Sequence, residues 1–581
     1  MKKVFLLFFL MVLGLCPALA QGNITVKGTV LDKENEEPLI GVTVLVKGTN
    51  KGTATDIDGN FSMSGLKKGQ TLVFSSVGMQ SYTYVVGKTE TIKVEMQQSV
   101  TNLDDVVVIG YGSSRKRDVT GSITSIGGED LKLVPTYNPV NALQGKVPSL
   151  MVTNSGGGST ILLRGIGTIQ SGTNPLFVVD GMLTDNIDFV SPSDIISIEV
   201  LKDPSSLSIF GVQGANGVII LTTKRAEQGK LSVSYDGYGG VQQVTNRDRV
   251  KLTNADEFTM LYNELLQNQA TTENPYKPWY PDLTGEGTDW VDLMLRPAAI
   301  TSHSLTIANS SKKASNVLSL NYFYQDGVLK YDNYNRYSVR YAGDYNVNDY
   351  VKIGSNMTLS KWSKDGQTAN IQNAVRSVPT YSPYAPEEYW DPENPGSYYN
   401  PAPSIQKDVA NPVANMEINK GTGDSYGYRG VGNAFLELNF LDGFQFKATG
   451  YIDLGLSSSS SFSPKYNINK GTSNSSQKRE TNSFSRDAAE YAKYQADFLL
   501  NYKKQIDKHN ISAMIGYTAY LKESQGFSAG ADTIGGKAMN VVPEDFWMLS
   551  QGDAKSKTNS DWYDAEAFMS YLARVGYQYD S

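Results

Sequence analysis

The sequence predicts a mainly β protein with three folded parts, and three observations support this. Short β-rich runs separated by turn signals fill residues 24–97. Apolar β-branched runs and glycine turns mark a mixed α/β part over residues 113–225. From about residue 230, long segments alternate apolar and polar residues, with tight turns on one side and long connections on the other. This last pattern is typical of a transmembrane antiparallel β-barrel.

The composition of the 581-residue chain narrows the classes of function. The formal net charge is -7, and charged residues make up 19% of the sequence. A nucleic-acid binder normally carries a basic stripe, so we expect no nucleic acid as a partner. The 35 tyrosines and 54 glycines suit a β-rich protein with an amphipathic surface.

Residues 1–20 have the pattern of a cleaved secretory signal. Lys2 and Lys3 supply the basic start, an apolar run follows over residues 4–15, and Ala18-Leu19-Ala20 has the small-residue pattern of a cleavage site. The mature chain is therefore expected to start at Gln21, after cleavage behind Ala20. A transmembrane helix is the alternative, but it needs roughly 20 apolar residues.

Cys16 is the only cysteine and lies inside this signal. Leu15 precedes it where a lipoprotein signal needs a small residue, so we expect no lipidation. Cleavage would leave no thiol in the mature chain, which excludes disulfides and thiolate metal sites.

Residues 21–97 are predicted to form a small β-sandwich. A turn signal at Asp58-Gly59-Asn60 and another from Gly65 to Gly69 separate its β-rich runs, and short strands at such intervals are typical of sandwiches. The expected strands are Ile24–Val30, Val42–Val46, Thr71–Phe74 and Tyr82–Val86.

Residues 98–112 are predicted to be a linker that ends in a β-prone run, Asp104-Asp105-Val106-Val107-Val108-Ile109-Gly110. An extended run on a linker can add as a strand to the sheet edge of a partner protein, where backbone hydrogen bonds supply the affinity. An ordinary edge strand is the alternative for this run taken by itself.

Residues 113–225 are predicted to be a mixed α/β domain. A short helix is expected at Asn141–Gln144, and buried strands at Phe177–Val179, Ile196–Leu201 and Val218–Thr222. Glycines from Gly211 to Gly217 mark tight turns or close backbone approaches.

Residues 226–581 are predicted to hold about ten long strands with two distinct faces. In one of them Tyr337, Val339 and Tyr341 oppose Arg336, Ser338 and Arg340; in the next, Val351, Ile353, Met357 and Leu359 oppose Lys352, Asn356 and Thr358. A soluble sandwich would explain the alternation but not strands of this length. The barrel is therefore the favoured fold for this part, with tyrosines at the bilayer interface.

Three parts of the chain carry a resemblance to known families. Residues 26–61, from Val26-Lys27-Gly28 to Phe61, resemble the carboxypeptidase-regulatory-like domain, a non-catalytic β-sandwich. The run Asp104–Gly110 resembles the TonB box of SusC-type transporters. Further segments resemble the plug domain of the same family: Leu143–Pro148, Leu163–Gly167, Asn174–Gly181, Ile198–Asp203 and Gly214–Ile219. The plug-motif residues singled out within them are Arg164, Gly165, Asp180, Gly181, Gly214, Asn216 and Gly217.

This resemblance implies a TonB-dependent outer-membrane transporter of the SusC family. It implies that substrate, an oligosaccharide or a peptide, binds above the plug, often beneath a SusD-like surface lipoprotein. TonB, energised through ExbB and ExbD, would then bind Asp104–Gly110 and displace the plug. The resemblance also implies a periplasmic N-terminal domain, contact with outer-membrane lipid, no cofactor and no bond-breaking chemistry. With about ten strands against the 22 of plugged transporters, we expect the chain to be the N-terminal part of a longer barrel.

Motifs for catalysis are weak. Gly156-Gly157-Gly158 lacks the Gly-Lys-Ser/Thr ending of a phosphate loop. His303 and His509 do not have the spacing of a zinc site, and no acidic pair stands out as a glycosidase pair. A cell-surface hydrolase and a surface adhesin stay as alternatives from other functional classes. The first would need a metal or carboxylate site, and the second would have no use for a plug or a TonB box.

Overall fold

The computed structural model describes residues 24–33, 37–47, 49, 51–76, 79, 82–87, 90–96, 106–108, 113–115, 123–155, 158–167, 172–226, 229–245, 251–365, 370–394, 396–401, 405–406, 409–468, 478–536, 539 and 541–579. The predicted signal, with its cleavage site at Ala20 and Gln21, lies outside these residues. The chain divides into two compact units, residues 1–107 with 113–120, and residues 108–112 with 121–581. Each unit is described by itself.

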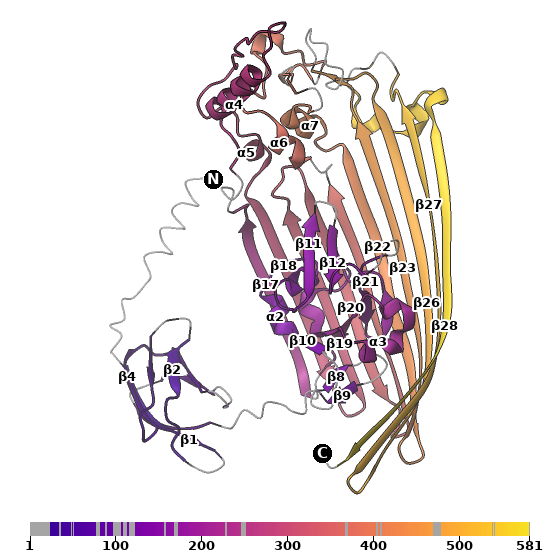
Figure 1. The fold of residues 1–581 in the computed structure, drawn as a ribbon. Helices are drawn as coiled ribbons and strands as arrows, with labels where there is room; N and C mark the ends of the chain where they lie inside the picture. The colour runs from indigo at the N-terminus through magenta and orange to yellow at the C-terminus, as the bar shows by residue number, and fades with distance from the viewer. Residues whose placement is uncertain are drawn as a thin grey trace, which may run out of the picture. The chain divides into compact units, whose positions relative to one another are not determined.

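The first unit is the predicted β-sandwich (Figure 1). One sheet has the order β4-β1-β7, with β1 antiparallel to β4 and parallel to β7; the other has the order β3-β2-β5-β6. The strands are β1 (Ile24–Asp32), β2 (Thr43–Val46), β3 (Gly52–Ala54), β4 (Asn60–Leu66), β5 (Thr71–Ser75), β6 (Tyr82–Val85) and β7 (Glu90–Met96).

Alternate residues of these strands fill the space between the two sheets. Val26 and Val30 of β1 pack in the same core as Phe74 of β5, and all three are fully buried. Phe61 meets Phe74 edge to face, with ring centroids 5.1 Å apart. The turn predicted at Asp58-Gly59-Asn60 is present, and Gly59 has a φ of +72°, which glycine adopts at little cost.

The second unit contains a domain over residues 123–223, called the plug below (Figure 1). Its central sheet has five strands in the order β10-β15-β16-β13-β14, and β11 pairs with β12 beside it. Its elements are β10 (Ile123–Gly127), α2 (Gly128–Lys132), η2 (Asn141–Leu143), β11 (Leu150–Ser155), β12 (Gly158–Leu163), β13 (Leu176–Val179), β14 (Met182–Thr184), η3 (Pro192–Asp194), β15 (Ile195–Leu201), α3 (Pro204–Leu207), η4 (Ser208–Gly214) and β16 (Val218–Thr223).

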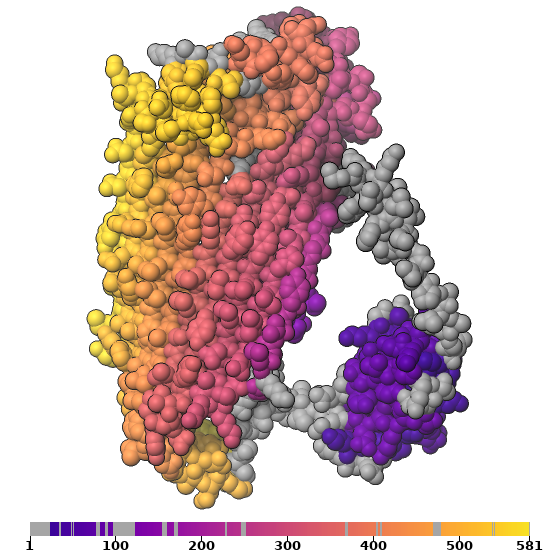
Figure 2. All heavy atoms as spheres, turned by 180° about the vertical axis from the view of Figure 1, so that it is seen from behind, coloured from indigo at the N-terminus to yellow at the C-terminus, as the bar shows by residue number. Residues whose placement is uncertain are grey.

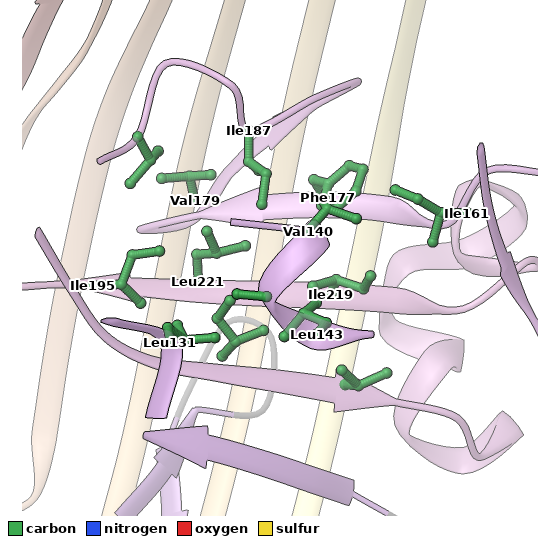
Figure 3. Packing of buried hydrophobic residues seen from close by; sticks show 14 of the residues in the cluster. Leu131, Val140, Leu143, Ile161, Phe177, Val179, Ile187, Ile195, Ile219 and Leu221 are labelled. Atoms are coloured by element: carbon green, nitrogen blue, oxygen red, sulfur yellow. The ribbon is translucent and has the colours of Figure 1, made fainter. Parts of the chain in front are cut away.

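The plug has an apolar core of its own (Figure 3). Phe177 and Val179 of β13 pack with Ile219 and Leu221 of β16, whose backbones run parallel. Leu131 of α2 and Leu143 of η2 cover the sheet from one side and are fully buried. Burying the short apolar runs on both faces explains why they lack the alternation of a half-exposed strand.

The rest of the second unit is an antiparallel sheet of ten strands, called the wall below. Neighbours in the sheet are neighbours in sequence, and β17 and β28 form its two edges. The strands are β17 (Gly229–Gln242), β18 (Ala298–Ser310), β19 (Ala314–Asp326), β20 (Asn333–Asn346), β21 (Val351–Asp365), β22 (Gly423–Phe440), β23 (Phe444–Ser463), β26 (Ser483–Ile506), β27 (His509–Asp532) and β28 (Thr558–Tyr579). No helix within the described residues is long and apolar enough to cross a membrane.

The wall carries tight turns at one end and long connections at the other. The turns include Leu441-Asp442-Gly443, which joins β22 to β23. The long connections contain helices that the sequence did not predict (Figure 1). They are α4 (Ala255–Asn268), α5 (Trp290–Met294), α6 (Ile371–Arg376) and α7 (Pro412–Ile418), with short turns η6 (Glu387–Tyr389), η8 (Glu544–Phe546), η9 (Leu549–Gln551) and η10 (Ala554–Ser556) and the small sheet of β24 (Tyr466–Asn467) and β25 (Lys478–Arg479).

The two faces of the wall differ as the sequence predicted. Arg336 and Arg340 are buried against the plug. The residues that alternate with them along the strand, Tyr337, Val339 and Tyr341, are exposed on the opposite face. Figure 2 shows that opposite face as one continuous surface of neighbouring strands. The predicted fold class, a sandwich, a plug and an antiparallel sheet of long membrane-type strands, is confirmed.

The later wall strands are longer than predicted. The sequence alternates apolar and polar residues over Phe444–Ile452, which predicts a strand there, but β23 continues to Ser463. The added part contains five consecutive serines, Ser457–Ser461, so apolar and polar residues no longer alternate there. It stays in the sheet because its backbone pairs with β26, for example Ser457 with Ala489.

We predict that residues 21–97 fold alone and without metal. Phe74→Ala should lower the free energy of unfolding by about 3–5 kcal/mol, because it removes a fully buried ring. Ile57→Ala is the matched control: this side chain is exposed, so the change should stay within about 0.5 kcal/mol. Urea unfolding of the isolated domain measures both, and a disordered product or a midpoint that shifts with chelator would contradict the prediction.

Candidate functional site

The plug-motif residues lie at the two ends of the parallel strand pair β13 and β16. Gly214, Asn216 and Gly217 precede β16, whereas Asp180 and Gly181 follow β13. The parallel register Leu176↔Val218 to Val179↔Leu221 puts these two groups at opposite ends of the sheet. The structure therefore does not bring the predicted residues together in one site.

The end that holds Gly217 is a packed turn. Gly217 has a φ of +94°, and a Cβ there would come within 2.2 Å of Leu163 at the end of β12. Arg164 and Gly165 follow directly in the same region, both with positive φ and both exposed. The Asn216 side chain donates to the carbonyl of Gly172 at 2.7 Å, which closes the loop before β13. These contacts give the motif a structural role in the plug.

The other end touches the wall. The carboxylate of Asp180 accepts hydrogen bonds from the backbone N–H of Thr223 at 3.0 Å and from the Thr223 hydroxyl. Asn356 of β21 donates to the same carboxylate, and Arg340 of β20 donates to the Thr223 hydroxyl. Gly181 lies against Tyr451 of the wall so closely that a Cβ would come within 2.5 Å of its hydroxyl.

A second set of contacts is centred on Arg429 of β22, which the sequence did not single out. Its guanidinium holds Asp453 of β23 through two hydrogen bonds of 2.9 and 2.7 Å, and Asp453 is fully buried. The same guanidinium donates to Thr184 at 2.9 Å and to Asn186, both in the plug. It also lies 4.2 Å from the ring centroid of Phe189. Arg429 thus connects the neighbouring wall strands β22 and β23 and also connects the wall to the plug.

Asp185, between those two plug residues, pairs with two lysines of the wall. Its carboxylate lies 2.8 Å from Lys493 Nζ and 3.0 Å from Lys522 Nζ. Burial by itself would raise the pKa of Asp185, but the two ammonium groups hold this pKa below its usual value. The carboxylate therefore stays ionised, and the attraction between plug and wall stays in force at neutral pH.

Arg336 of β20 makes a third contact. Its guanidinium donates to the carbonyl oxygens of Tyr137, at 3.2 Å, and Asp188 in the plug. Burial raises the pKa of the Asp188 carboxyl, and Arg336 and Arg429 oppose that rise. The alternation placed Arg336 on the polar face of its strand; that the plug covers this face could not be derived from the strand alone.

A large open cavity of about 720 Å³ lies on the side of the plug that faces the long connections. Plug residues Tyr137, Asn186 and Asp188 line its floor, and Arg336 and Arg429 line its wall. Aromatic and amide side chains are abundant around it: Tyr334, Trp362, Tyr491 and Trp562 are aromatic, and Asn141, Gln325 and Asn333 carry amides. Three acidic and three basic side chains line it as well, so the cavity suits a polar ligand with flat apolar faces.

The predicted TonB box is only partly described. Val106–Val108 form the strand β8, which pairs with β9 (Ser113–Arg115) in a two-stranded sheet. Asp104, Asp105, Ile109 and Gly110 lie outside the described residues. The backbone of these three valines is extended, and the binding of TonB to the run Asp104–Gly110 stays a prediction.

A buried carboxyl in the plug has no ionic partner among the described residues. Glu199 of β15 is 2% exposed and lies between Ser125 of β10 and Ile220 of β16. Within the part of the chain that the structure describes, its Oε2 atom has no hydrogen-bond partner. Burial raises the pKa of Glu199. No group of three or more potential metal ligands occurs among the described residues, and His303 and His509 instead accompany Tyr235 and Tyr577 on different strands.

Comparison with known proteins agrees with this architecture. The CarboxypepD_reg-like domain model matches residues 26–108, and the TonB-dependent Receptor Plug Domain model matches residues 115–218. The TonB-dependent receptor P3 of Formosa agariphila is 28% identical over 605 residues, which cover 100% of this chain and 55% of that receptor. The TonB-dependent receptor SusC of Bacteroides thetaiotaomicron is 32% identical over 474 residues, which cover 76% of this chain and 45% of SusC.

A solved structure has the same fold. The RagAB peptide importer in its open-open state superposes with a TM-score of 0.66 at 21% identity, over 82% of this chain and 55% of that chain. The chain spans about half the length of the curated relatives it matches. The first family model also extends into the predicted linker of residues 98–112.

The plug, the wall and these matches define the class: the chain is a TonB-dependent receptor. Within that class it belongs to the SusC-like receptors, as its sequence predicted. Receptors of this family are outer-membrane proteins and are not enzymes, so the prediction of a non-enzymatic function is confirmed by the relatives.

We predict that Glu199→Gln stabilises the plug at neutral pH. Folding raises the pKa of Glu199 above its unfolded value of about 4.3. The contribution of this side chain to the stability of the fold is therefore complete below pH ~4.3, and it is lost as the pH rises through the folded-state pKa. Glutamine keeps the shape without the charge. The variant should therefore exchange its plug amides more slowly than the wild type at pH 7 and equally near pH 4, after correction for intrinsic exchange.

Glu129→Gln is the matched control for this pH test. Glu129 is exposed and pairs with Lys132 at 2.8 Å, and this hydrogen bond lowers its pKa. Its replacement should give no gain in protection at pH 7. Equal protection of wild type and Glu199→Gln at both pH values would contradict the burial argument.

Proposed function

We propose that the protein imports oligosaccharides across the outer membrane in a TonB-dependent cycle. The observation that carries this proposal is the cavity above the plug, lined by aromatic rings and side-chain amides. Sugar rings offer flat C–H faces that pack on aromatic rings, and hydroxyls that exchange hydrogen bonds with amides and carboxylates. A peptide importer is the alternative, because an extended peptide can use the same amides.

The outer face of the wall supports membrane insertion. The rings of Tyr235, His303, Tyr322 and Tyr337 follow each other across β17 to β20, with centroid separations of 6.1, 6.3 and 4.9 Å. A second row, Phe440, Phe444 and Tyr502, lies next to the tight turns. Two aromatic rows flanking apolar side chains are typical of strands that contact outer-membrane lipid.

The steps of the proposed cycle are those that the resemblance to SusC-type transporters implies. Substrate enters from the side of the long connections, beneath a SusD-like surface lipoprotein, and rests on the plug. TonB, energised through ExbB and ExbD, adds a strand to Asp104–Gly110 on the periplasmic side and pulls. The plug then leaves the wall, and the substrate passes. The sandwich of residues 24–96 lies in the periplasm in this proposal.

The substrate class is tested by uptake into cells that carry the protein in their outer membrane. Trp362→Ala should reduce the apparent affinity for a labelled oligosaccharide roughly tenfold, because it removes an aromatic face from the cavity. Trp390→Ala, which truncates a tryptophan outside this cavity, should leave uptake unchanged. Uptake of peptides but of no oligosaccharide would instead favour the peptide importer.

The TonB box is tested separately from the substrate. Val107→Pro should abolish uptake while substrate binding persists, because proline removes a backbone donor that strand addition requires. Val107→Thr keeps the donor and the strand preference and should retain uptake. Uptake by Val107→Pro that remains sensitive to a proton-gradient uncoupler would place the TonB contact elsewhere in the chain.

A further inference from the structure

A second, very small cavity lies between the plug and the wall, apart from the large one. Its volume is about 20 Å³. Asp180, Asp194 and Thr223 of the plug line one side, and Arg340 and Asn356 of the wall line the other. A cavity needs roughly 10–15 Å³ of such volume to hold one water molecule, so this one has room for one.

Several polar atoms on this cavity have no hydrogen-bond partner among the described residues. They are Oδ1 of Asp194, Oδ1 of Asn356, and Nε and Nη1 of Arg340. The three side chains are 2%, 8% and 1% exposed. Their remaining polar atoms are occupied: Arg340 Nη2 donates to Thr223 and to the Lys224 carbonyl, and Asp194 Oδ2 accepts from Asn321 at 2.9 Å.

Leaving these atoms without partners would be costly. A buried polar group without a hydrogen bond costs about 1–3 kcal/mol, and more when it is charged. The unpaired set contains donors on Arg340 and acceptors on Asp194 and Asn356. A molecule that both accepts and donates hydrogen bonds satisfies all three residues at once.

The charges around the cavity select a neutral occupant. A cation would face the guanidinium of Arg340, and an anion would face the carboxylates of Asp180 and Asp194. Water is neutral, fits the volume, and makes about three hydrogen bonds at a typical buried site. It can accept from Arg340 while donating to Asp194 and Asn356.

We propose that one ordered water molecule occupies this cavity and joins Arg340 of the wall to Asp194 of the plug. The water then adds an exchangeable link to the direct hydrogen bonds that Arg340 and Asn356 donate to the plug at this point. When the plug moves, solvent water can replace each lost hydrogen bond in turn. The inference concerns the attachment of the plug and does not depend on which substrate the protein carries.

The direct test is a structure of the full chain, purified from outer membranes, at a resolution that shows ordered water. The expected result is a single peak within hydrogen-bonding distance of Arg340, Asp194 and Asn356. A direct pair between the Arg340 and Asp194 side chains, a bound ion, or a cavity without density would overturn the proposal.

A variant tests the role of the water in solution. Val431 lines the cavity, and Val431→Ile adds one methyl group that would displace the water. The Lys224 amide, which donates to the Asp194 carbonyl at 2.8 Å, should then exchange about tenfold faster, as expected when a charged hydrogen bond is lost. A dry cavity would be filled favourably by the methyl group, so unchanged or slower exchange would overturn the proposal.

Two controls separate loss of the water from overpacking. Val431→Thr keeps the volume of valine, so the water and the protection of Lys224 should remain. Val152→Ile adds the same methyl group elsewhere in the apolar core of the plug, away from the cavity. If Val152→Ile accelerates the exchange of Lys224 as much as Val431→Ile does, the effect comes from overpacking and the proposal fails.

Discussion

The polar contact between the plug and the inward face of the wall is the constraint on which the rest of the structure depends. Charges such as Asp453 and Arg340 are buried there, and a buried charge without a partner is strongly destabilising. A wall strand that contacts the plug therefore has to carry a polar group at the position where it meets a polar group of the plug. The single side chain of Arg429, for example, forms hydrogen bonds with Asp453 of the wall and with Thr184 and Asn186 of the plug.

Apolar residues, unlike these polar groups, pack mainly within the plug and less between the plug and the wall. The two apolar clusters of the plug are made mainly by the plug itself, and the wall residues described in them are Val431, Tyr451, Tyr520 and Phe568. Apolar packing thus mainly holds the plug together as one body, whereas its contact with the wall combines many hydrogen bonds and ion pairs with a few aromatic contacts. Water can replace hydrogen bonds but cannot replace apolar packing, so displacement of the plug costs less than its unfolding. This division suits the proposed cycle, in which the plug leaves the wall and returns.

Much of the fold could be predicted from local patterns. Alternation over residues 336–345 identified both the strand and its two faces, since a strand that contacts two different environments repeats every two residues. Alternation failed over Ser457–Ser461, where both faces are polar and the strand is held by backbone pairing and by hydrogen bonds of the serine hydroxyls. The helix α4 was missed inside a long connection, although Asn254 and Glu257 form a capping box that could have marked its start.

The site was harder to predict than the fold. The plug motif identified Asp180, but not its contact with Asn356, because the two residues are 176 positions apart. Arg429 carries no motif at all; its role depends on the plug hairpin that lies against it. Such long-range pairings follow from the register of the sheet and the position of the plug, which no short segment encodes.

The most direct measurement of the central claim tethers the plug to the wall. The side-chain Oγ atoms of Ser193 in the plug and Ser304 in the wall lie 3.0 Å apart, so cysteines at these two positions would bring their sulfur atoms close together across the contact. With Ser193→Cys and Ser304→Cys, oxidation should stop energised uptake, reductant should restore it, and substrate binding should persist throughout. Each single variant should transport under both conditions. Full uptake with the disulfide formed would contradict the account, because the substrate would then pass a plug that cannot leave the wall.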